Sequence, residues 1–336
     1  MDPLSQGTVG AAFAQSTANK NNILRIGVIG FLAGLAPDLD ILIRSSDDPI
    51  LFLEYHRQFT HSLFFIPFGS LIVALLIFPL VKRSMGFKTV YLASLLGYAT
   101  HGLLDACTSY GTQLFWPFSN ERVTWNNISI IDPLFTIPVL IFVGTAIKTR
   151  KRLFSFFAIG WATFYLSLGF VQYERTLSTA IELAHSRGHN AERLTLKPSF
   201  GNLILWKSIY QHEEKFYVDA IRTVRSPTWC SGENIRMFDY QQHLPNLDED
   251  SQQKKDIERF RWFSQDYLGF DEEKNLVTDV RYSMIPNQIT PMWGLVIDDQ
   301  QDVNEHAIWW TSRSLEQSQL DLFKEMLSGK KCRNQT

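Results

Sequence analysis

Long apolar stretches separated by short polar connections fill the first half of the chain. They cover residues 23–43, 62–81, 90–107, 130–147 and 153–171. The stretches at 62–81 and 153–171 contain no charged residue, and a helix of about 20 residues spans roughly 30 Å, the hydrocarbon thickness of a bilayer. This pattern predicts an α-helical membrane domain of about five transmembrane helices over residues 1–171. The alternative, a buried bundle in a soluble protein, would have to bury all five stretches in a chain of 336 residues.

The pattern changes after residue 171, where Glu, Asp, Lys, Gln and Asn become frequent. Amphipathic periodicity predicts three helices, at 174–186, 250–268 and 314–327. Short aromatic and β-branched runs predict strands, which are expected at 203–209, 215–224, 276–283, 293–298 and 307–311. Residues 172–336 are therefore expected to form a small soluble α+β domain.

Basic residues in the short connections predict how the membrane domain is oriented. Lys82, Arg83 and Lys88 lie between the second and third apolar stretches, and further basic residues lie at 148–152 between the fourth and fifth. Basic connections stay on the cytoplasmic side, so residues 44–61, 108–129 and 172–336 are expected on the outer side. Residues 1–22 do not resemble a cleavable signal peptide, so the first apolar stretch is expected to act as an uncleaved anchor.

Composition narrows the choice of partners. A formal net charge of -2 gives no indication of nucleic-acid binding. The three cysteines, Cys107, Cys230 and Cys332, form neither a zinc-finger spacing nor a disulfide framework, and Cys107 follows an apolar helix, which favours an inert thiol. The sequence contains no nucleophile elbow and no P-loop. The expected partners are the lipid bilayer and a small-molecule or lipid-like substrate.

His101 and Asp105 give the first indication of chemistry. They lie four residues apart at the end of the third apolar stretch, so they share one face of a helix. An imidazole and a carboxylate at that depth are costly unless they pair, reach water or bind a metal. One interpretation is a His–Asp hydrogen bond that packs two helices. The other is a pair of ligands for one zinc-like ion, which the His-x-x-x-Asp spacing suits.

Further candidate ligands are expected at the same membrane face. Pro37 is expected to break the first apolar stretch, and the aspartates that follow it could converge on a cation there. Each candidate also has a structural interpretation: a helix cap for an aspartate, a surface position for a histidine, and an ordinary helix start for the Asp-Pro pair at 132–133. The full candidate set is Asp38, Asp40, His56, His61, His101, Asp105 and Asp132.

Mixed histidine and aspartate ligands favour zinc, with manganese or iron as alternatives, over calcium, which prefers oxygen ligands alone. Seven such residues could hold two ions. A bound metal lowers the pKa of its water to about 7, so a metal-bound hydroxide could attack an ester or phosphoester. His56 is expected to act as a ligand or a proton shuttle. Arg57 is expected either to hold a phosphate or oxyanion or to anchor the chain at the membrane interface.

Five motifs in a fixed order resemble a known family. They are MDPLSQG at 1–7, PDLD at 37–40, HRQFTHS at 56–62, HGLLDACTSYGTQLFWPFS at 101–119 and IIDPLFT at 130–136. The set resembles the YdjM-type family of bacterial inner-membrane proteins, to which metal-dependent hydrolase activity is ascribed. The resemblance runs from residue 1 to about residue 170 and implies a multi-pass protein of the bacterial inner membrane. With the orientation that the basic connections predict, the C-terminal domain is expected in the periplasm. Many members carry Thr-His where this chain has Ser5 and Gln6, so this chain lacks that histidine.

The resemblance also implies that the seven candidate residues form the metal-hydrolase centre. The sequence therefore predicts a membrane-embedded metal-dependent hydrolase that acts at the outer membrane face. A membrane protein that transports or handles metal ions is one alternative, although the polar residues gather near one face and do not continue through the stretches at 62–81 and 153–171. A membrane anchor that presents the C-terminal domain to a partner is a second alternative, and it leaves the clustering of the motifs unexplained.

Overall fold

A computed structural model describes residues 1–314, 316–330 and 333–334 of the chain. They divide into two compact units, one of residues 1–43, 55–171 and 200–203 and the other of residues 44–54, 172–199 and 204–336. The first unit is helical and the second contains two antiparallel sheets with helices. This confirms the predicted order of a helical region followed by an α+β region.

The helical unit begins with a helix that the polar and small residues of its sequence did not predict. Helix α1 (Pro3–Gln15) is capped by Asp2, whose side chain accepts from the backbone N–H of Ser5, and proline occupies its first position. The other elements are α2 (Ile23–Leu35), η1 (Ala36–Leu42), η2 (Phe59–His61), α4 (Ile66–Val81), α5 (Phe87–Ala106), α6 (Pro133–Thr149) and the first part of α7 (Leu153–Ser186).

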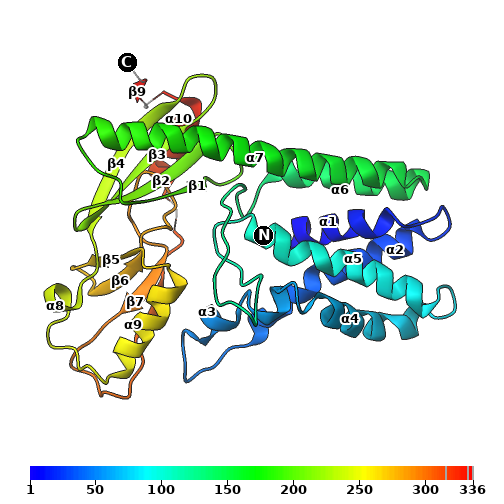
Figure 1. The fold of residues 1–336 in the computed structure, drawn as a ribbon, viewed down its shortest axis with the longest axis horizontal. Coiled ribbons are helices and arrows are strands. Elements are labelled where there is room, and N and C mark those ends of the chain that lie inside the picture. The colour runs from blue at the N-terminus through cyan, green and yellow to red at the C-terminus, as the bar shows by residue number, and fades with distance from the viewer. Residues whose placement is uncertain (315, 331–332, 335–336) are drawn as a thin grey trace. The chain divides into compact units, whose positions relative to one another are not determined.

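Three glycines bring the backbones of α1, α2 and α5 into direct contact (Figure 1). A Cβ atom at Gly30 of α2 would overlap the carbonyl group of Gly10 of α1, and one at Gly97 of α5 would overlap the carbonyl oxygen of Gly30. In lipid, helix association gains little from the hydrophobic effect, and small residues allow the backbones to pack closely instead. The result is a tight three-helix core, which carries the polar residues described below.

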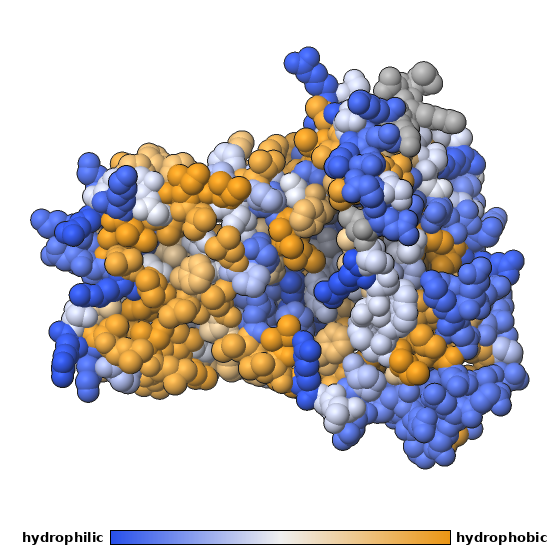
Figure 2. Space-filling view, turned by 180° about the vertical axis from the view of Figure 1, so that it is seen from behind, coloured by the Kyte–Doolittle hydropathy of each residue, from blue (hydrophilic) through white to orange (hydrophobic). Residues whose placement is uncertain are grey.

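The outer surface of the helical unit is apolar, as Figure 2 shows by its broad area of hydrophobic side chains. Many large aliphatic and aromatic side chains on three helices are exposed, more than a soluble surface commonly carries. They include Phe68, Ile72, Leu75, Leu76 and Leu80 on α4, Ile137 and Ile141 on α6, and Phe156, Phe157, Phe164 and Phe170 on α7.

Fewer helices are long and apolar enough to cross a membrane than the five apolar stretches predicted. Among the described residues, α7 alone is long and apolar enough to cross a bilayer by itself, and residues 51–61 with α4 qualify only if this bent pair is counted as one broken span. Helix α2 has 13 residues and α6 has 17, short of the roughly 20 needed. The five-span count is therefore not established by these helices.

The second unit contains a five-stranded and a four-stranded antiparallel sheet. The first has the order β1 (Arg193–Pro198), β2 (Leu205–His212), β3 (Lys215–Arg222), β4 (Thr228–Arg236) and β9 (Arg333–Asn334). The second has the order β5 (Leu268–Asp271), β6 (Leu276–Asp279), β7 (Trp293–Val296) and β8 (Ile308–Thr311). The helices are α3 (Leu51–Tyr55, of which Tyr55 belongs to the helical unit), the second part of α7, α8 (Tyr240–His243), α9 (Gln252–Phe263) and α10 (Gln317–Ser328).

The five predicted strands correspond to β2, β3, β6, β7 and β8, with shifted ends. Strands β1, β4, β5 and β9 were not predicted: β1 and β4 are rich in polar residues, β5 begins at Leu268, inside the helix predicted at 250–268, and β9 has two residues. The helix predicted at 174–186 is the end of α7, which continues through residue 171 without a break. The predicted helix at 250–268 is shorter, as α9, and that at 314–327 is α10.

The two faces of the five-stranded sheet are covered by different elements. Tyr173 of α7 packs its ring on Trp206, with ring centroids 6.1 Å apart. On the other face, Cys230 lies in an apolar cluster with Met326 of α10. Cys230 is disulfide-bonded, contrary to the prediction of no disulfide, and Cys332 lies outside the described residues. Cys107 is free and buried.

Two lysines are buried next to each other in the five-stranded sheet. Lys197 of β1 pairs across the ladder with Lys207 of β2, and they are 6% and 4% exposed. Lys207 Nζ donates to Ser283 Oγ (2.7 Å) and to the carbonyl oxygen of Gln288 (2.9 Å). Burial lowers the pKa of Lys207 to about 7, and it also lowers the pKa of Lys197. The amino groups of Lys197 and Lys207 are therefore expected to be neutral in the folded sheet.

The buried lysine makes the stability of the C-terminal unit depend on pH. Between pH 7 and roughly 10.4 the unfolded chain binds a proton at Lys207 that the folded unit does not, so the free energy of unfolding should rise with pH, by up to about 1.4 kcal/mol per pH unit. Replacing Lys207 by Met should remove that part of the slope. Urea unfolding of the full-length protein in detergent, followed by tryptophan fluorescence from pH 7 to 9, measures it.

The exposed Lys215 of β3 provides the matched control for this experiment. Lys215→Met should unfold with the same pH slope as the unsubstituted protein. If the Lys207→Met variant shows the same pH slope as the unsubstituted protein, the assignment of Lys207 as a neutral buried amine is wrong.

Candidate metal centre

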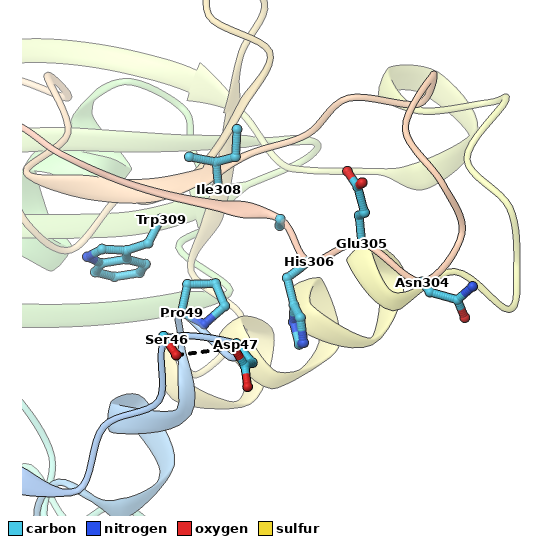
Figure 3. Close-up of a pocket in the computed structure, with 9 residues that line it drawn as sticks. Ser46, Asp47, Pro49, Asn304, Glu305, His306, Ile308 and Trp309 are labelled. Atoms are coloured by element: carbon cyan, nitrogen blue, oxygen red, sulfur yellow. Dashed lines mark hydrogen bonds between the residues drawn. The ribbon is translucent and has the colours of Figure 1, made fainter.

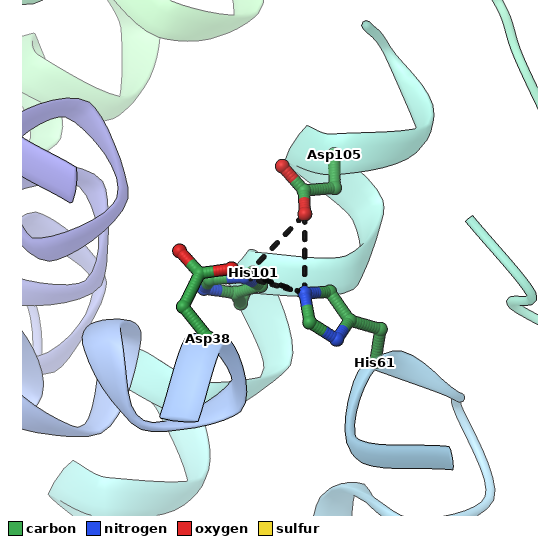
Figure 4. A group of neighbouring side chains, drawn as sticks. All are labelled: Asp38, His61, His101 and Asp105. Carbon is green, nitrogen blue, oxygen red and sulfur yellow. Dashed lines mark hydrogen bonds and ion pairs between the residues drawn. The ribbon is translucent and has the colours of Figure 1, made fainter. Parts of the chain in front are cut away.

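Four side chains from three separate elements converge in the helical unit (Figure 4). Asp38 comes from η1, His61 from η2, and His101 and Asp105 from α5. His61 Nε2 lies 3.4 Å from Asp38 Oδ1 and 3.2 Å from Asp105 Oδ2, and His101 Nε2 lies 3.3 and 3.5 Å from the same two atoms. The side chains of His61, His101 and Asp105 are fully buried, while that of Asp38 is 27% exposed. This group could hold a metal ion, with its open side at Asp38.

Each imidazole has one nitrogen engaged by a neighbouring acceptor. His101 Nδ1 lies 2.6 Å from the carbonyl oxygen of Gly34, which can only accept, so Nδ1 carries the proton. His61 Nδ1 lies 3.2 Å from Asp40 Oδ2 and 3.0 Å from Thr60 Oγ1. The two Nε2 atoms face each other across 2.9 Å. Two imidazole nitrogens at this distance repel unless a proton or a cation lies between them.

Local sequence features explain why these side chains meet. Helix α2 ends at Leu35, close to the break predicted at Pro37, and Pro37 lies in the first turn of the 3-10 helix η1 that carries Asp38 and Asp40. Gly102 faces η2, and a Cβ atom there would overlap the carbonyl oxygen of His61. The absence of a side chain at Gly102 therefore allows His61 to reach α5.

Asp40 supports the group from behind. Its Oδ1 lies 2.8 Å from His56 Nδ1, and its Oδ2 accepts from the backbone N–H of Arg57 (2.9 Å) and from Thr60 Oγ1 (2.8 Å), in addition to its contact with His61. A carboxylate that holds the outer nitrogen of a ligand histidine fixes the ring and raises its basicity. Asp38, Asp40 and His56 also form a second group close enough to hold an ion.

Arg57 points into the site. It is 5% exposed, its Nε lies 3.1 Å from Asp105 Oδ2, and its Nη1 donates to Thr108 Oγ1 at 3.0 Å. Its guanidinium carbon lies 4.9 Å from the centre of the Tyr110 ring. Its backbone is left-handed, with φ of 65°, a conformation that costs a non-glycine residue about 1 kcal/mol and is held here by the Asp40 contact. This burial excludes the alternative role of Arg57 as an interfacial anchor.

Helix α1 contributes two polar groups that the residues alone did not single out. Gln6 Nε2 donates to Asp105 Oδ1 at 2.8 Å, and the amino group of Met1 also contacts Asp105 Oδ1. The available signal was the family resemblance, since Gln6 stands where many members carry the histidine of a Thr-His pair. The structure places this position directly on the candidate centre.

Asp132 lies outside both groups that could hold an ion. It caps α6 by accepting from the backbone N–H of Leu134 (3.1 Å) and Phe135 (3.4 Å), and its other oxygen accepts from Tyr165 Oη at 2.8 Å. Asp132 therefore lies at the start of α6 as its cap, which is the structural interpretation given above for the Asp-Pro pair at 132–133.

Comparisons with known proteins identify the family of this chain. The family described as YdjM inner membrane protein matches residues 1–176, so the chain belongs to this family. The Bacillus subtilis (strain 168) protein described as "Uncharacterized protein YfhP" is 32% identical over 111 residues. That match covers 33% of this chain and 33% of the relative, so the chain spans about a third of the relative's length. No solved structure matches the chain.

Metal binding by the four-residue group is a direct prediction of this geometry. His101→Ala should abolish stoichiometric metal binding, and Asp40→Asn, which weakens the support of His61, should lower metal affinity by roughly 10–100-fold. Metal analysis and metal titration of the detergent-purified protein measure both effects.

His185→Ala is the matched control, because His185 lies exposed on α7 in the other unit. This variant should bind metal like the unsubstituted protein. Equal metal content in His101→Ala and His185→Ala would contradict the assignment.

Proposed function

We propose that this member of the YdjM family is a membrane-embedded, metal-dependent hydrolase whose ion is held by Asp38, His61, His101 and Asp105. The observation that carries the proposal is the pair of imidazole Nε2 atoms facing each other at 2.9 Å, between two carboxylates, in the interior of the helical unit. Ionisable groups inside such a unit are costly, and they commonly mark function.

The donor set fits zinc best among common ions. Two neutral imidazoles and two carboxylates match its preference for four nitrogen and oxygen ligands, and manganese or iron are the alternatives. Asp105 Oδ2 is buried and lies 3.2 Å from His61 Nε2 and 3.5 Å from His101 Nε2, a position from which a carboxylate oxygen can share an ion with both imidazoles. When bound, the ion supplies a water molecule whose pKa lies near 7. Asp132 is not included, because the cap of α6 and Tyr165 occupy its oxygens.

The residues around the ion site have separate roles in this proposal. Asp38, the most exposed of the four donors, marks the side from which substrate and water enter. His56, held on Asp40 and 18% exposed, takes a proton from the attacking water and passes it to solvent. Arg57 places its guanidinium beside Asp105 and neutralises negative charge that develops on an ester or phosphoester oxygen.

A lipid-like substrate is supported by the surface near the site. Phe115 and Phe118 are 49% and 81% exposed, and the ring of Trp116 lies 6.0 Å from that of Phe59 in η2. Aromatic side chains of this kind gather where protein meets the interfacial region of a bilayer. We propose that they guide a lipid-like ester toward the open side of the donor group.

The proposal places the C-terminal unit in the periplasm of a multi-pass, five-span inner-membrane protein. Two observations support it: the basic residues at 82–88 and 148–152, and the disulfide-bonded Cys230. Disulfides persist in oxidising compartments such as the periplasm and are rare in the cytosol. None of the contacts described above specifically supports the transport alternative. The anchor alternative gives no role to the facing imidazoles of His61 and His101.

Hydrolysis tests the enzymatic part of the proposal. The zinc-loaded protein in lipid nanodiscs should release product from a panel of carboxyl and phosphate esters with lipid-like chains, and Asp105→Asn should lower kcat/KM by a factor of about 10³ or more. If the metal-loaded protein hydrolyses none of these esters, the metal-handling alternative explains the site better than a hydrolase.

Topology is tested separately from chemistry. A reporter fused after residue 171 should report the periplasm, and one inserted at residues 82–88 should report the cytoplasm, because basic connections are retained inside. The same side for both reporters would rule out the five-span arrangement.

A further inference from the structure

The segment of residues 44–54 joins the two halves of the donor set but packs with the C-terminal unit. Asp38 and Asp40 precede it in η1, and His56 and His61 follow it. The segment is thus covalently bonded at both ends to the pieces of chain that carry the donors. The contacts described below, which fix it, lie within the C-terminal unit.

Apolar contacts seat the segment. Ile50 is fully buried and Leu53 is 2% exposed. The ring of Phe52 packs edge-on against Trp309 of β8 at 5.3 Å, and Trp309 packs against Phe260 of α9 at 5.9 Å. The segment is therefore held against α9 and β8 and is not a free loop.

Arg259 of α9 binds two carboxylates of this segment, one near its middle and one at its end. Its Nη1 and Nη2 donate to the two oxygens of Asp48 at 3.1 and 2.7 Å, and its Nε donates to Glu54. Two parallel bonds from one guanidinium to one carboxylate fix direction as well as distance. Partial burial acts to raise the pKa of Asp48, but the hydrogen bond and charge of Arg259 outweigh it and lower that pKa below its usual value.

A buried carboxylate holds the guanidinium in place. Asp256, fully buried, accepts from Arg259 Nη1 at 3.1 Å. Its other oxygen accepts from the backbone N–H of Ala307 (3.0 Å) and lies 2.8 Å from His306 Nδ1. Arg259 is therefore set by the C-terminal unit before it binds the segment.

The segment has room to move if Arg259 is removed. It borders an open pocket of about 530 Å³ lined by its own Ser46, Asp47 and Pro49 and by residues 304–309 (Figure 3). Glu54 lies two residues before His56, which contacts Asp40 at 2.8 Å. A shift of the segment would therefore pull on the contact that supports His61.

We infer that Arg259 is a positioning residue for the metal centre, through which the C-terminal unit fixes the 44–54 segment and with it the donors on either side. This inference rests on the proposed metal centre. An ordinary surface ion pair contributes at most about 1 kcal/mol to stability. Arg259 instead fixes the positions of residues 36–43 and 55–62, which flank the segment and carry donors.

The test compares two arginines of the same helix in the full-length protein. Arg259→Gln should weaken zinc affinity about tenfold and should increase hydrogen exchange in residues 36–43 and 55–62 of the metal-free protein. Arg261→Gln is the control, since Arg261 is similarly exposed but pairs with Glu258 and Asp266, away from the segment. It should change neither measurement.

A second set of variants covers the case in which Arg259→Gln fails to fold. Asp48→Asn with Glu54→Gln removes the partners on the segment and leaves α9 intact, and it should reproduce the loss of affinity. Combining it with Arg259→Gln should add nothing further, because both changes break the same contact. Additive losses would point to general destabilisation and would overturn the inference.

The two hypotheses fail in different ways. If the unsubstituted protein binds no metal, the proposed function is wrong, and the exchange rates still decide whether Arg259 holds the donor segments. If the unsubstituted protein binds zinc and Arg259→Gln binds it equally well with unchanged exchange, the positioning role is wrong and the metal centre stands.

Discussion

The helical unit depends on compensating the charge of carboxylates buried among imidazoles. Asp40 and Asp105 are fully buried, and each faces more than one cationic or polar partner. Arg57 offsets part of the charge at Asp105, and the two facing Nε2 atoms need a proton or a cation between them. A divalent ion resolves both problems together, because it takes carboxylates as anions and imidazoles as neutral donors. The break at Pro37, the bare face at Gly102 and the bonds to Asp40 all follow from the need to bring these donors to one point.

The parts of the site that could be predicted from sequence are those set by local geometry. His101 and Asp105 lie on one face because they are four residues apart on a helix, and Pro37 ends α2 because proline lacks an N–H. The division between ligand and support could not be predicted. Asp132 has the sequence signature of a helix cap, and whether a capping carboxylate also reaches a site depends on where its helix lies.

The same limit applies to the fold. Composition separates the apolar half from the polar half, but it does not show that α1, made of small and polar residues, fills the centre of the helical unit. Strand β4 has four consecutive exposed residues, so its sequence carries no alternation that would reveal it. The 44–54 segment looks like a connection inside the membrane domain, and its contacts with Trp309 and Arg259, far away in sequence, place it in the other unit. Each of these features is decided by partners distant in sequence.

The close packing of helices and the chemistry of the site are a single arrangement. His101 can donate to the carbonyl oxygen of Gly34 only if α5 lies against the end of α2, and the glycines at 30 and 97 allow that approach. The backbone of α2 thus selects the tautomer that leaves His101 Nε2 free for an ion. A larger residue at either glycine would separate the helices, and the imidazole would lose its acceptor before any donor was removed. The small residues of the helical core are therefore as necessary to the proposed centre as the histidines and aspartates themselves.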